Sequence, residues 1–363
     1  MGLARFLDIA KLAALSGGPG FAQIAVTNDC NADCGFCNFA RGKGIAKSSA
    51  PVNRLLRAID TLHAGGVRYL VFVGGEPLVY GGLEDAISHT RDKGIEPVIC
   101  TNGQLLHDDK IKRLKAAGLR NIIISIDAPD AETHDKNRGL PGLTDRIRRA
   151  NKTLASSGMH STASVTISRL VGDFKKLPAY LRDMGFKDVT FSYPLRELHS
   201  TYLSFSDSEL VEYSKDELIG IFLGLKALKK DIKVLNPSAG MDEMIRFLKN
   251  EPSRFPCLAG YKYFFLDWNL DVYRCHYMKD RICAVEDFPG AAPIRDGCDI
   301  CMIDCYRDPS VLQHVAVSFR DSVDELLHGH LGTAYRRLFN QNNYISLKAV
   351  AEEFGLVTRY GGR

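Results

Sequence analysis

Apolar residues in the first two hundred positions alternate between short continuous runs and longer amphipathic stretches. The short runs predict buried strands, and the longer stretches have the spacing of helices. Several of these helices end at a glycine followed by an apolar run, as in DKGIEPV and AAGLRNI, which is a common helix stop signal. The predicted strands are 21–26, 67–73, 96–100, 121–127, 161–168 and 187–194, and the predicted helices are 51–64, 82–93, 108–117, 142–158 and 173–184.

A strand and a helix together recur about every 30 residues, which suits βα units and a parallel sheet. Six such units are fewer than the eight of a closed TIM barrel. The predicted fold is therefore α/β, either a partial (β/α)6 TIM-like barrel or an open doubly wound sheet. Beyond residue 200 the pattern predicts helices at 207–232 and 240–250 without a strand between them, and a last helix near 321–339.

These changes of pattern divide the chain into four parts. They are an N-terminal helix (1–18), the partial barrel (19–204), a helical connector (205–256), and a cysteine-bearing domain with C-terminal helices (257–363).

Composition and charge exclude several classes of protein. The chain has 363 residues, of which 45% are hydrophobic and 25% charged, as in ordinary globular proteins. A net charge of +4 gives no reason to expect nucleic acid. No apolar run approaches the roughly 18–20 residues of a transmembrane segment, and Asp8 and Lys11 interrupt the N-terminal apolar patch, which makes it a poor secretory signal. We expect a cytoplasmic protein.

Eight of the ten cysteines form two groups, and Cys100 and Cys283 lie outside them. In a reducing compartment, grouped thiols indicate metal ligands more than disulfides. The first group, Cys30, Cys34 and Cys37, has C-x3-C-x2-C spacing directly after the first predicted strand. Three thiolates can hold three irons of a 4Fe–4S cluster and leave the fourth iron open to a chelating molecule. A structural zinc site would need a fourth ligand, and no further Cys or His lies nearby in the sequence. Buried or zinc-bound cysteines are the alternative.

This spacing, with Phe36 before the last cysteine, resembles the signature of the radical S-adenosylmethionine (SAM) superfamily. Further motifs follow later predicted strands. Gly74-Gly75-Glu76-Pro77 resembles the family's GGEP motif, Thr101-Asn102-Gly103 its TNG turn, and Ser125-Ile126-Asp127 with His134-Asp135 and Arg138-Gly139 the SxD…HD..RG stretch of its MoaA-like branch.

The resemblance covers about residues 20–200 and implies both cofactors and chemistry. A reduced 4Fe–4S cluster would cleave SAM to a 5′-deoxyadenosyl radical that attacks an unactivated carbon, with electrons from a flavodoxin- or ferredoxin-type donor. Asp127 could instead be a strand-end cap. The residues implied to bind the cofactor are Gly74, Gly75, Glu76, Pro77, Asn102, Ser125, Asp127 and Ser168.

The second cysteine group offers five thiols for the four positions of an auxiliary iron–sulfur cluster or a zinc ion. It resembles the SPASM/Twitch extensions of the same superfamily, and the cysteine count favours a Twitch-like element with one cluster. In the hairpin that precedes one of these cysteines, Leu270 stands where the family has glycine. The tail is also similar to that of adenosylhopane synthase and its relatives in hopanoid lipid biosynthesis. The five cysteines are Cys257, Cys275, Cys298, Cys301 and Cys305.

The resemblance predicts a radical SAM enzyme that modifies a small-molecule or isoprenoid-like lipid substrate. We expect the short segment before the first predicted strand to leave no room for a leader-peptide-binding domain. A maturase of a ribosomal peptide is therefore the second alternative, behind a small-molecule or lipid substrate. From other classes, a non-catalytic two-cluster electron carrier and a zinc-stabilised binding protein also use grouped cysteines. A lipid substrate would bring the chain to a membrane surface as a peripheral protein.

Overall fold

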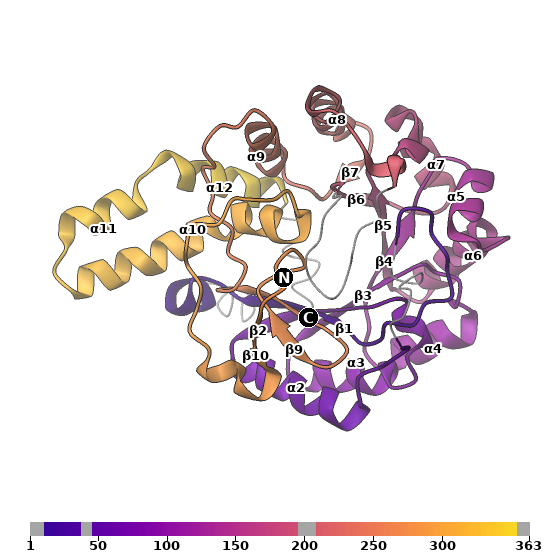
Figure 1. The fold of residues 1–363 in the computed structure, drawn as a ribbon, viewed down its shortest axis with the longest axis horizontal. Helices are drawn as coiled ribbons and strands as arrows, with labels where there is room; N and C mark the ends of the chain where they lie inside the picture. Colours follow the sequence, from indigo (N-terminus) through magenta and orange to yellow (C-terminus); the bar gives the residue numbers. More distant parts are fainter. Residues whose placement is uncertain (1–10, 38–45, 195–207, 354–363) are drawn as a thin grey trace.

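A computed structural model describes residues 11–37, 46–194 and 208–353 (Figure 1). Its strands form one sheet in the order β10-β9-β8-β1-β2-β3-β4-β5-β6-β7. The strands are β1 Gly20–Ala25, β2 Val67–Val73, β3 Glu96–Thr101, β4 Asn121–Ile126, β5 His160–Thr166, β6 Asp188–Ser192, β7 Lys233–Val234, β8 Tyr263–Leu266, β9 Asp271–Tyr273 and β10 Arg281–Ala284.

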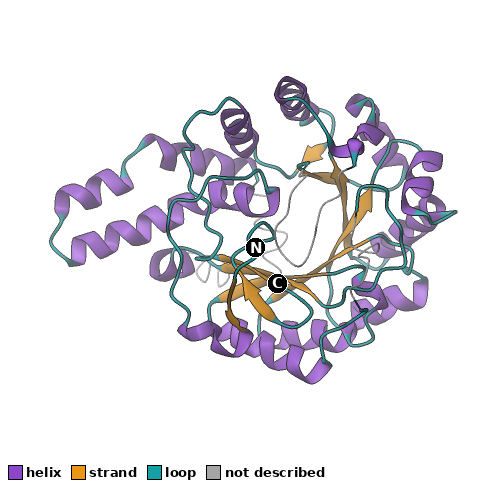
Figure 2. Cartoon of the chain, in the orientation of Figure 1, coloured by secondary structure: helices purple, strands orange, loops and turns teal. Residues whose placement is uncertain are grey.

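The strands from β8 through β1 to β7 are all parallel, and β9 and β10 extend the sheet in antiparallel fashion. Since β10 and β7 are the two ends of the order, the described sheet does not close. Figure 2 shows the strands as an inner arc with helices on its outer side. The prediction of a partial barrel is confirmed.

The helices alternate with the first strands and then gather at the C-terminal end. Residues 11–16 are also helical, residues 17 and 18 are not, and residues 1–10 of the predicted N-terminal helix lie outside the described residues. The helices are α2 Val52–Ala64, α3 Leu83–Asp92, α4 Asp108–Ala116, α5 Ala131–Arg138, α6 Leu143–Ser156, α7 Leu177–Asp183, α8 Lys215–Leu228, α9 Ser238–Leu248, α10 Asp304–Leu327, α11 Leu331–Leu338 and α12 Gln341–Glu352.

The main core lies between the outer face of the strands and the helices. Alternate strand residues, such as Ile24, Phe72 and Ile124, belong to one buried apolar cluster that also contains Leu55 of α2 and Ile147 of α6. The other face of each strand points into the arc, because side chains alternate along a strand. The inner face is therefore the one available to a ligand.

Three expectations about elements were wrong. The two helices after residue 200 do have a strand between them, because β7 pairs with β6, and two residues are too few to give a periodic pattern. No helix was predicted at α5, because this polar helix has only two buried residues, His134 and Arg138, and so carries no apolar stripe. The last helical region begins earlier than expected, with the 24-residue helix α10.

The C-terminal part shares the sheet with the barrel, because β8 pairs with β1 in parallel. β8 and β9 form the antiparallel hairpin that the sequence indicated. Leu270 in its turn has φ = 61°, a left-handed conformation that glycine usually supplies, although its side chain is fully buried. Helix α10 then packs against α11 and α12, which project together to one side (Figure 1). Within the described residues, no helix is long and apolar enough to cross a membrane.

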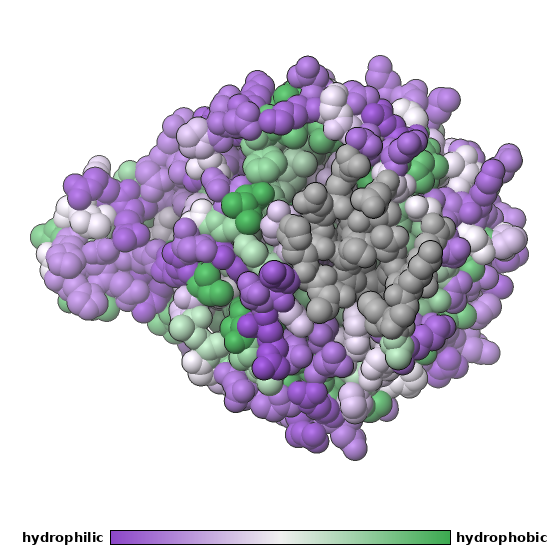
Figure 3. All heavy atoms as spheres, in the orientation of Figure 1, coloured by the Kyte–Doolittle hydropathy of each residue, from purple (hydrophilic) through white to green (hydrophobic). Residues whose placement is uncertain are grey.

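On the face seen in Figure 3, hydrophilic residues dominate the outer rim, and hydrophobic residues gather closer to the middle.

Candidate functional site

The first cysteine loop begins just after β1 and is fixed from the side of β2. Gly75 N donates to Thr27 O (2.9 Å) and Glu76 N donates to Asp29 O (2.8 Å), immediately before Cys30. A Cβ atom at position 75 would lie 2.1 Å from Asp29 O and 2.9 Å from the Cβ of Cys30. Only glycine therefore permits this approach of the β2 end to the cysteine loop.

The end of β3 provides the second support. Asn102 Nδ2 donates to Oδ1 of Asn31, inside the cysteine loop (2.7 Å). The buried Glu76 carboxylate accepts hydrogen bonds from Thr101 Oγ1 (2.6 Å), Asn102 N (2.7 Å) and Leu78 N (3.0 Å). Burial raises the pKa of Glu76, and these hydrogen bonds oppose that shift.

Helix α5 provides the third support, at its C-terminal end. Asp33 N donates to Arg138 O (3.0 Å), and Gly35 N donates to both O (3.2 Å) and Oδ1 (3.1 Å) of Asn137. Asp127 at the end of β4 accepts two hydrogen bonds from Arg138 (both 2.6 Å) and one from Asn137 Nδ2 (2.7 Å). Despite burial, the pKa of Asp127 is lowered, chiefly by the charge of Arg138. Asp127 thus holds Asn137 and Arg138, the two residues that hydrogen-bond to the cysteine loop.

None of the three cysteines of this loop forms a disulfide, and they lie close enough to interact electrostatically. Burial raises the pKa of Cys30 to about 12 and that of Cys34 to about 11. Three neighbouring thiols in a loop clamped by two strand ends and helix α5 form a donor set that fits a 4Fe–4S cluster with one open iron.

Hydroxyl groups line the inner face of the adjacent strands. Ser125 of β4, Ser164 of β5 and Thr190 of β6 stand in register across the sheet. Their sequence neighbours Ile124, Ile126, Ala163, Val165 and Val189 belong to the outer apolar core, which places the hydroxyls on the inner face. Ser125 is thus on the ligand-accessible side.

The other predicted residues of the GGEP motif are Gly74 and Pro77. They flank the contact with β1, and Pro77 is buried at the start of a short 3-10 helix.

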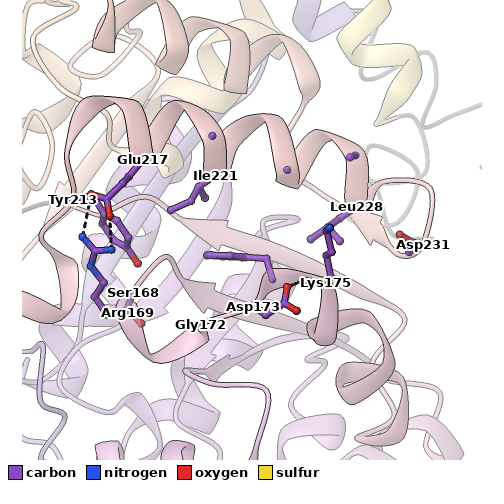
Figure 4. A pocket seen from close by; sticks show the side chains of 14 residues that line it. Ser168, Arg169, Gly172, Asp173, Lys175, Tyr213, Glu217, Ile221, Leu228 and Asp231 are labelled. Atoms are coloured by element: carbon purple, nitrogen blue, oxygen red, sulfur yellow. Dashed lines mark hydrogen bonds and ion pairs between the residues drawn. The ribbon is translucent and has the colours of Figure 1, made fainter.

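Ser168, at the end of β5, lies at a different place. It lines a pocket of about 700 Å³ between α8 and the segment 168–175, beside the Arg169–Glu217 ion pair (Figure 4). Its buried hydroxyl has no hydrogen-bond partner among the described residues. None of the residues that line this pocket is a cysteine, and the role of Ser168 in cofactor binding stays a prediction.

The second cysteine group is assembled from separate segments. Cys257, Cys275 and Cys301 are buried in one small apolar cluster, against which Cys298 and Cys305 also pack. Cys301 interacts electrostatically with Cys257, Cys275 and Cys298, and Cys257 N donates to Cys298 O (2.9 Å). Cys305 lies beside Gln23 of β1, on the inner face of the sheet. Among the described residues, no three Cys, His or carboxylate side chains converge on a point that suits a single metal ion.

Comparison with known proteins gives the family. The model of the Radical SAM superfamily matches residues 24–195, which contain the cysteine loop and all three of its supports. Residues 24–195 therefore carry a radical SAM domain. Members of this superfamily use a 4Fe–4S cluster and SAM.

Two curated relatives and one solved structure illustrate the likeness. The AdoMet-dependent heme synthase of Nitratidesulfovibrio vulgaris is 32% identical over 144 residues, 40% of this chain and 39% of that protein. The antilisterial bacteriocin subtilosin biosynthesis protein AlbA of Bacillus subtilis is 24% identical over 48% of this chain and 39% of that protein. The structure of anSMEcpe with bound AdoMet and Cp18Cys peptide shares the fold, with a TM-score of 0.56 and 17% identity over 90% of this chain and 99% of that one.

The matched region spans about two fifths of these curated relatives. The relatives are enzymes, and the radical SAM region is what they share with this chain. Sequence reasoning assigned no role to Asn31, Asn137 or Arg138. Two of them were visible in the motifs, since Asn31 lies between the first two cysteines and Arg138 belongs to the HD..RG stretch.

Proposed function

We propose that this chain is a radical SAM enzyme whose catalytic cluster is held by Cys30, Cys34 and Cys37. The observation that carries the proposal is the clamped loop, in which the ends of β2 and β3 and helix α5 hold together three thiols that form no disulfide. When bound, the cluster supplies the electron that cleaves SAM reductively.

The residues of this chain would bind and orient SAM. The backbone at Gly74 and Gly75 lies against the cysteine loop, where it can meet the methionine part of SAM. Ser125 and the neighbouring hydroxyls offer hydrogen bonds on the inner face. The carboxylates of Glu76 and Asp127 already accept hydrogen bonds from this chain, and we assign both to positioning.

We assign an auxiliary 4Fe–4S cluster to the second cysteine group. Cys301 interacts with Cys257, Cys275 and Cys298, which together make a complete set of four thiol ligands. Cys305 is then the fifth thiol and contacts Gln23. The residues from 257 onward form a Twitch-like extension that shares the barrel sheet through β8.

For the substrate, we favour a small or isoprenoid-like molecule, and the 32% identity over 144 residues to a heme synthase supports a small-molecule substrate. Similarity to the bacteriocin biosynthesis protein supports a peptide substrate as the second candidate. An electron donor of the flavodoxin or ferredoxin type would reduce the cluster.

Anaerobic reconstitution followed by dithionite and SAM tests the proposal, with 5′-deoxyadenosine measured by chromatography. The wild type should form it, and the triple variant Cys30→Ala, Cys34→Ala, Cys37→Ala should not. Cys283→Ala is the matched control, because Cys283 belongs to neither group. A wild type that holds iron and sulfide at both groups but binds no SAM would instead favour an electron carrier.

A further inference from the structure

The pocket that Ser168 lines runs along one side of helix α8. Its volume of about 700 Å³ is in the range of small-molecule sites. Figure 4 shows Glu217 toward one end of α8 and Leu228 toward the other, and both line the pocket. The helix rises about 16 Å between these two residues, at about 1.5 Å per residue. The pocket is therefore elongated along α8.

The outward side of α8 lacks the polar residues that a surface helix normally carries. No residue from 218 to 225 is polar. Leu218, Phe222 and Leu225 are buried on the inner side of the helix. On the pocket side, Gly220 and Gly224 are exposed. Helix α8 thus presents an apolar surface to the pocket as well as to the core.

The two glycines are not explained by the packing of this chain. Apart from proline, glycine is the least favourable residue in a helix interior. A Cβ atom at position 220 or 224 would meet no described atom within 4 Å. No neighbour within the described chain therefore requires a glycine at either position. Both glycines leave space at the pocket wall, which indicates room for a ligand.

The side chain of Ser168 gives a second, independent indication. This residue is only 1% exposed, and its hydroxyl has no hydrogen-bond partner in the described part of the chain. Buried hydroxyl groups nearly always have such a partner. A hydroxyl or carbonyl group of a ligand would supply it at this end of the pocket.

The charges around the pocket favour a neutral ligand over an anionic one. Arg169 is already engaged, because it donates two hydrogen bonds to Glu217 (2.6 and 3.1 Å) and lies 4.2 Å from the centroid of the Tyr213 ring. The charged lining residues are three acidic and two basic side chains, Asp173, Glu217, Asp231, Arg169 and Lys175.

The chain between Leu210 and Tyr213 joins this pocket to the first cysteine loop. Leu210 Cδ1 lies 3.3 Å from the position of a Cβ atom at Gly35, inside that loop. Tyr213 lines the pocket, and Arg169 Nε donates to Glu212 O (3.1 Å). A molecule in the pocket would therefore contact a segment that also touches the cysteine loop.

We propose that this pocket binds a neutral, elongated and mostly apolar small molecule that carries a hydrogen-bonding group at the Ser168 end. Gly220 and Gly224 make room for its apolar part. The inference goes beyond the proposed function, because it assigns a second ligand site and requires no cluster chemistry.

Equilibrium dialysis of the reconstituted protein with farnesol, a neutral isoprenoid alcohol, tests this. Farnesol should bind saturably and one to one, and excess SAM should not displace it. Farnesyl diphosphate, which has the same chain and a negative charge, should bind at least about tenfold more weakly, because acidic residues outnumber basic ones in the lining. Ser168→Ala should weaken farnesol binding by about threefold and leave the binding of farnesene, which has no hydroxyl, unchanged.

The double variant Gly220→Ala, Gly224→Ala gives the sharpest readout. Its two methyl groups occupy the pocket wall and should weaken farnesol binding by about tenfold. The same variant should unfold at a higher temperature than the wild type, because alanine is the better helix former. A glycine needed only for packing would give the opposite shift in unfolding temperature.

Gly332→Ala is the matched control, because Gly332 is an exposed glycine of helix α11 that does not line the pocket. It should also raise the unfolding temperature but leave farnesol binding unchanged. The inference is overturned by the absence of saturable binding, by displacement with SAM, by equal affinities of the wild type and the double variant, or by a less stable double variant. None of these measurements requires SAM cleavage, and they can therefore fail while the proposed function holds.

Discussion

The two cysteine groups of this chain are built in opposite ways. The first lies within eight residues of one loop, and hydrogen bonds from three other elements hold it. The second draws its thiols from segments up to 48 residues apart and buries them in an apolar cluster, with α10 starting between its last two cysteines. A local loop needs outside supports to keep its shape, whereas a dispersed site depends on the packing of its whole region.

The largest expected effects separate the two groups chemically. Replacing Cys30, Cys34 and Cys37 by Ala should abolish 5′-deoxyadenosine formation and remove about half of the iron. Replacing Cys298 and Cys301 by Ala should also remove about half of the iron, because a second cluster loses two ligands, but should leave SAM cleavage measurable. Iron analysis and chromatography on the same samples check both. Full iron in the Cys298 and Cys301 variant would argue against an auxiliary cluster.

A smaller effect concerns the second cysteine group alone. Arg274 donates two hydrogen bonds to Asp296 (both 2.6 Å) and one to Ala259 O, and Asp296 accepts from Cys298 N. Arg274→Ala should lower the free energy of unfolding by about 2 kcal/mol, because the carbonyl of the buried Ala259 loses its donor and the exposed Asp296 loses its partner. Urea denaturation measures this.

Arg295→Ala is the matched control, because it breaks an exposed pair with Asp321 and should cost less than about 1 kcal/mol. Equal losses for both variants would show that Arg274 does not organise the cysteine segments.

The seam between the barrel and α10 should respond to pH. Asp308 of α10 accepts hydrogen bonds from Tyr193 Oη and Asn236 Nδ2, and burial raises its pKa to about 8. Between pH 4 and 8 the unfolded carboxyl is ionised while the folded one keeps its proton. Stability should therefore fall as pH rises through this window, by at most about 1.4 kcal/mol per pH unit for this group.

Asp308→Asn should remove this part of the pH dependence, as urea denaturation at pH 6, 7 and 8 would show. A slope identical to that of the wild type would mean that Asp308 is ionised in the folded protein.

The smallest effect concerns the β8–β9 turn. Because Leu270 has φ = 61° and a buried side chain, both replacements by small residues lose apolar burial. Leu270→Gly also relieves the left-handed strain, and it should be more stable than Leu270→Ala by about 1 kcal/mol. Thermal unfolding of the two variants compares them directly. A more stable Ala variant would show that the turn carries no such strain.

Local patterns made much of the fold predictable. The six strands before residue 200 were found nearly at their observed positions, because each is a short run rich in apolar or β-branched residues. The glycine stops were also found, and Gly118 after α4 has φ = +94°. The polar helix α5 and the two-residue strand β7 could not be found in this way, because neither carries an apolar repeat of useful length.

By itself, the sequence determined the cysteine spacing, the motifs at the strand ends and the alternation of strands and helices, since all of these depend on near neighbours in the chain. Only the tertiary structure decided what surrounds them. Asn137 reaches Gly35 across 102 residues, β8 pairs with β1, and the dispersed cysteines meet. Such contacts form because the whole core packs at once, and no local pattern records which distant residue will complete a site.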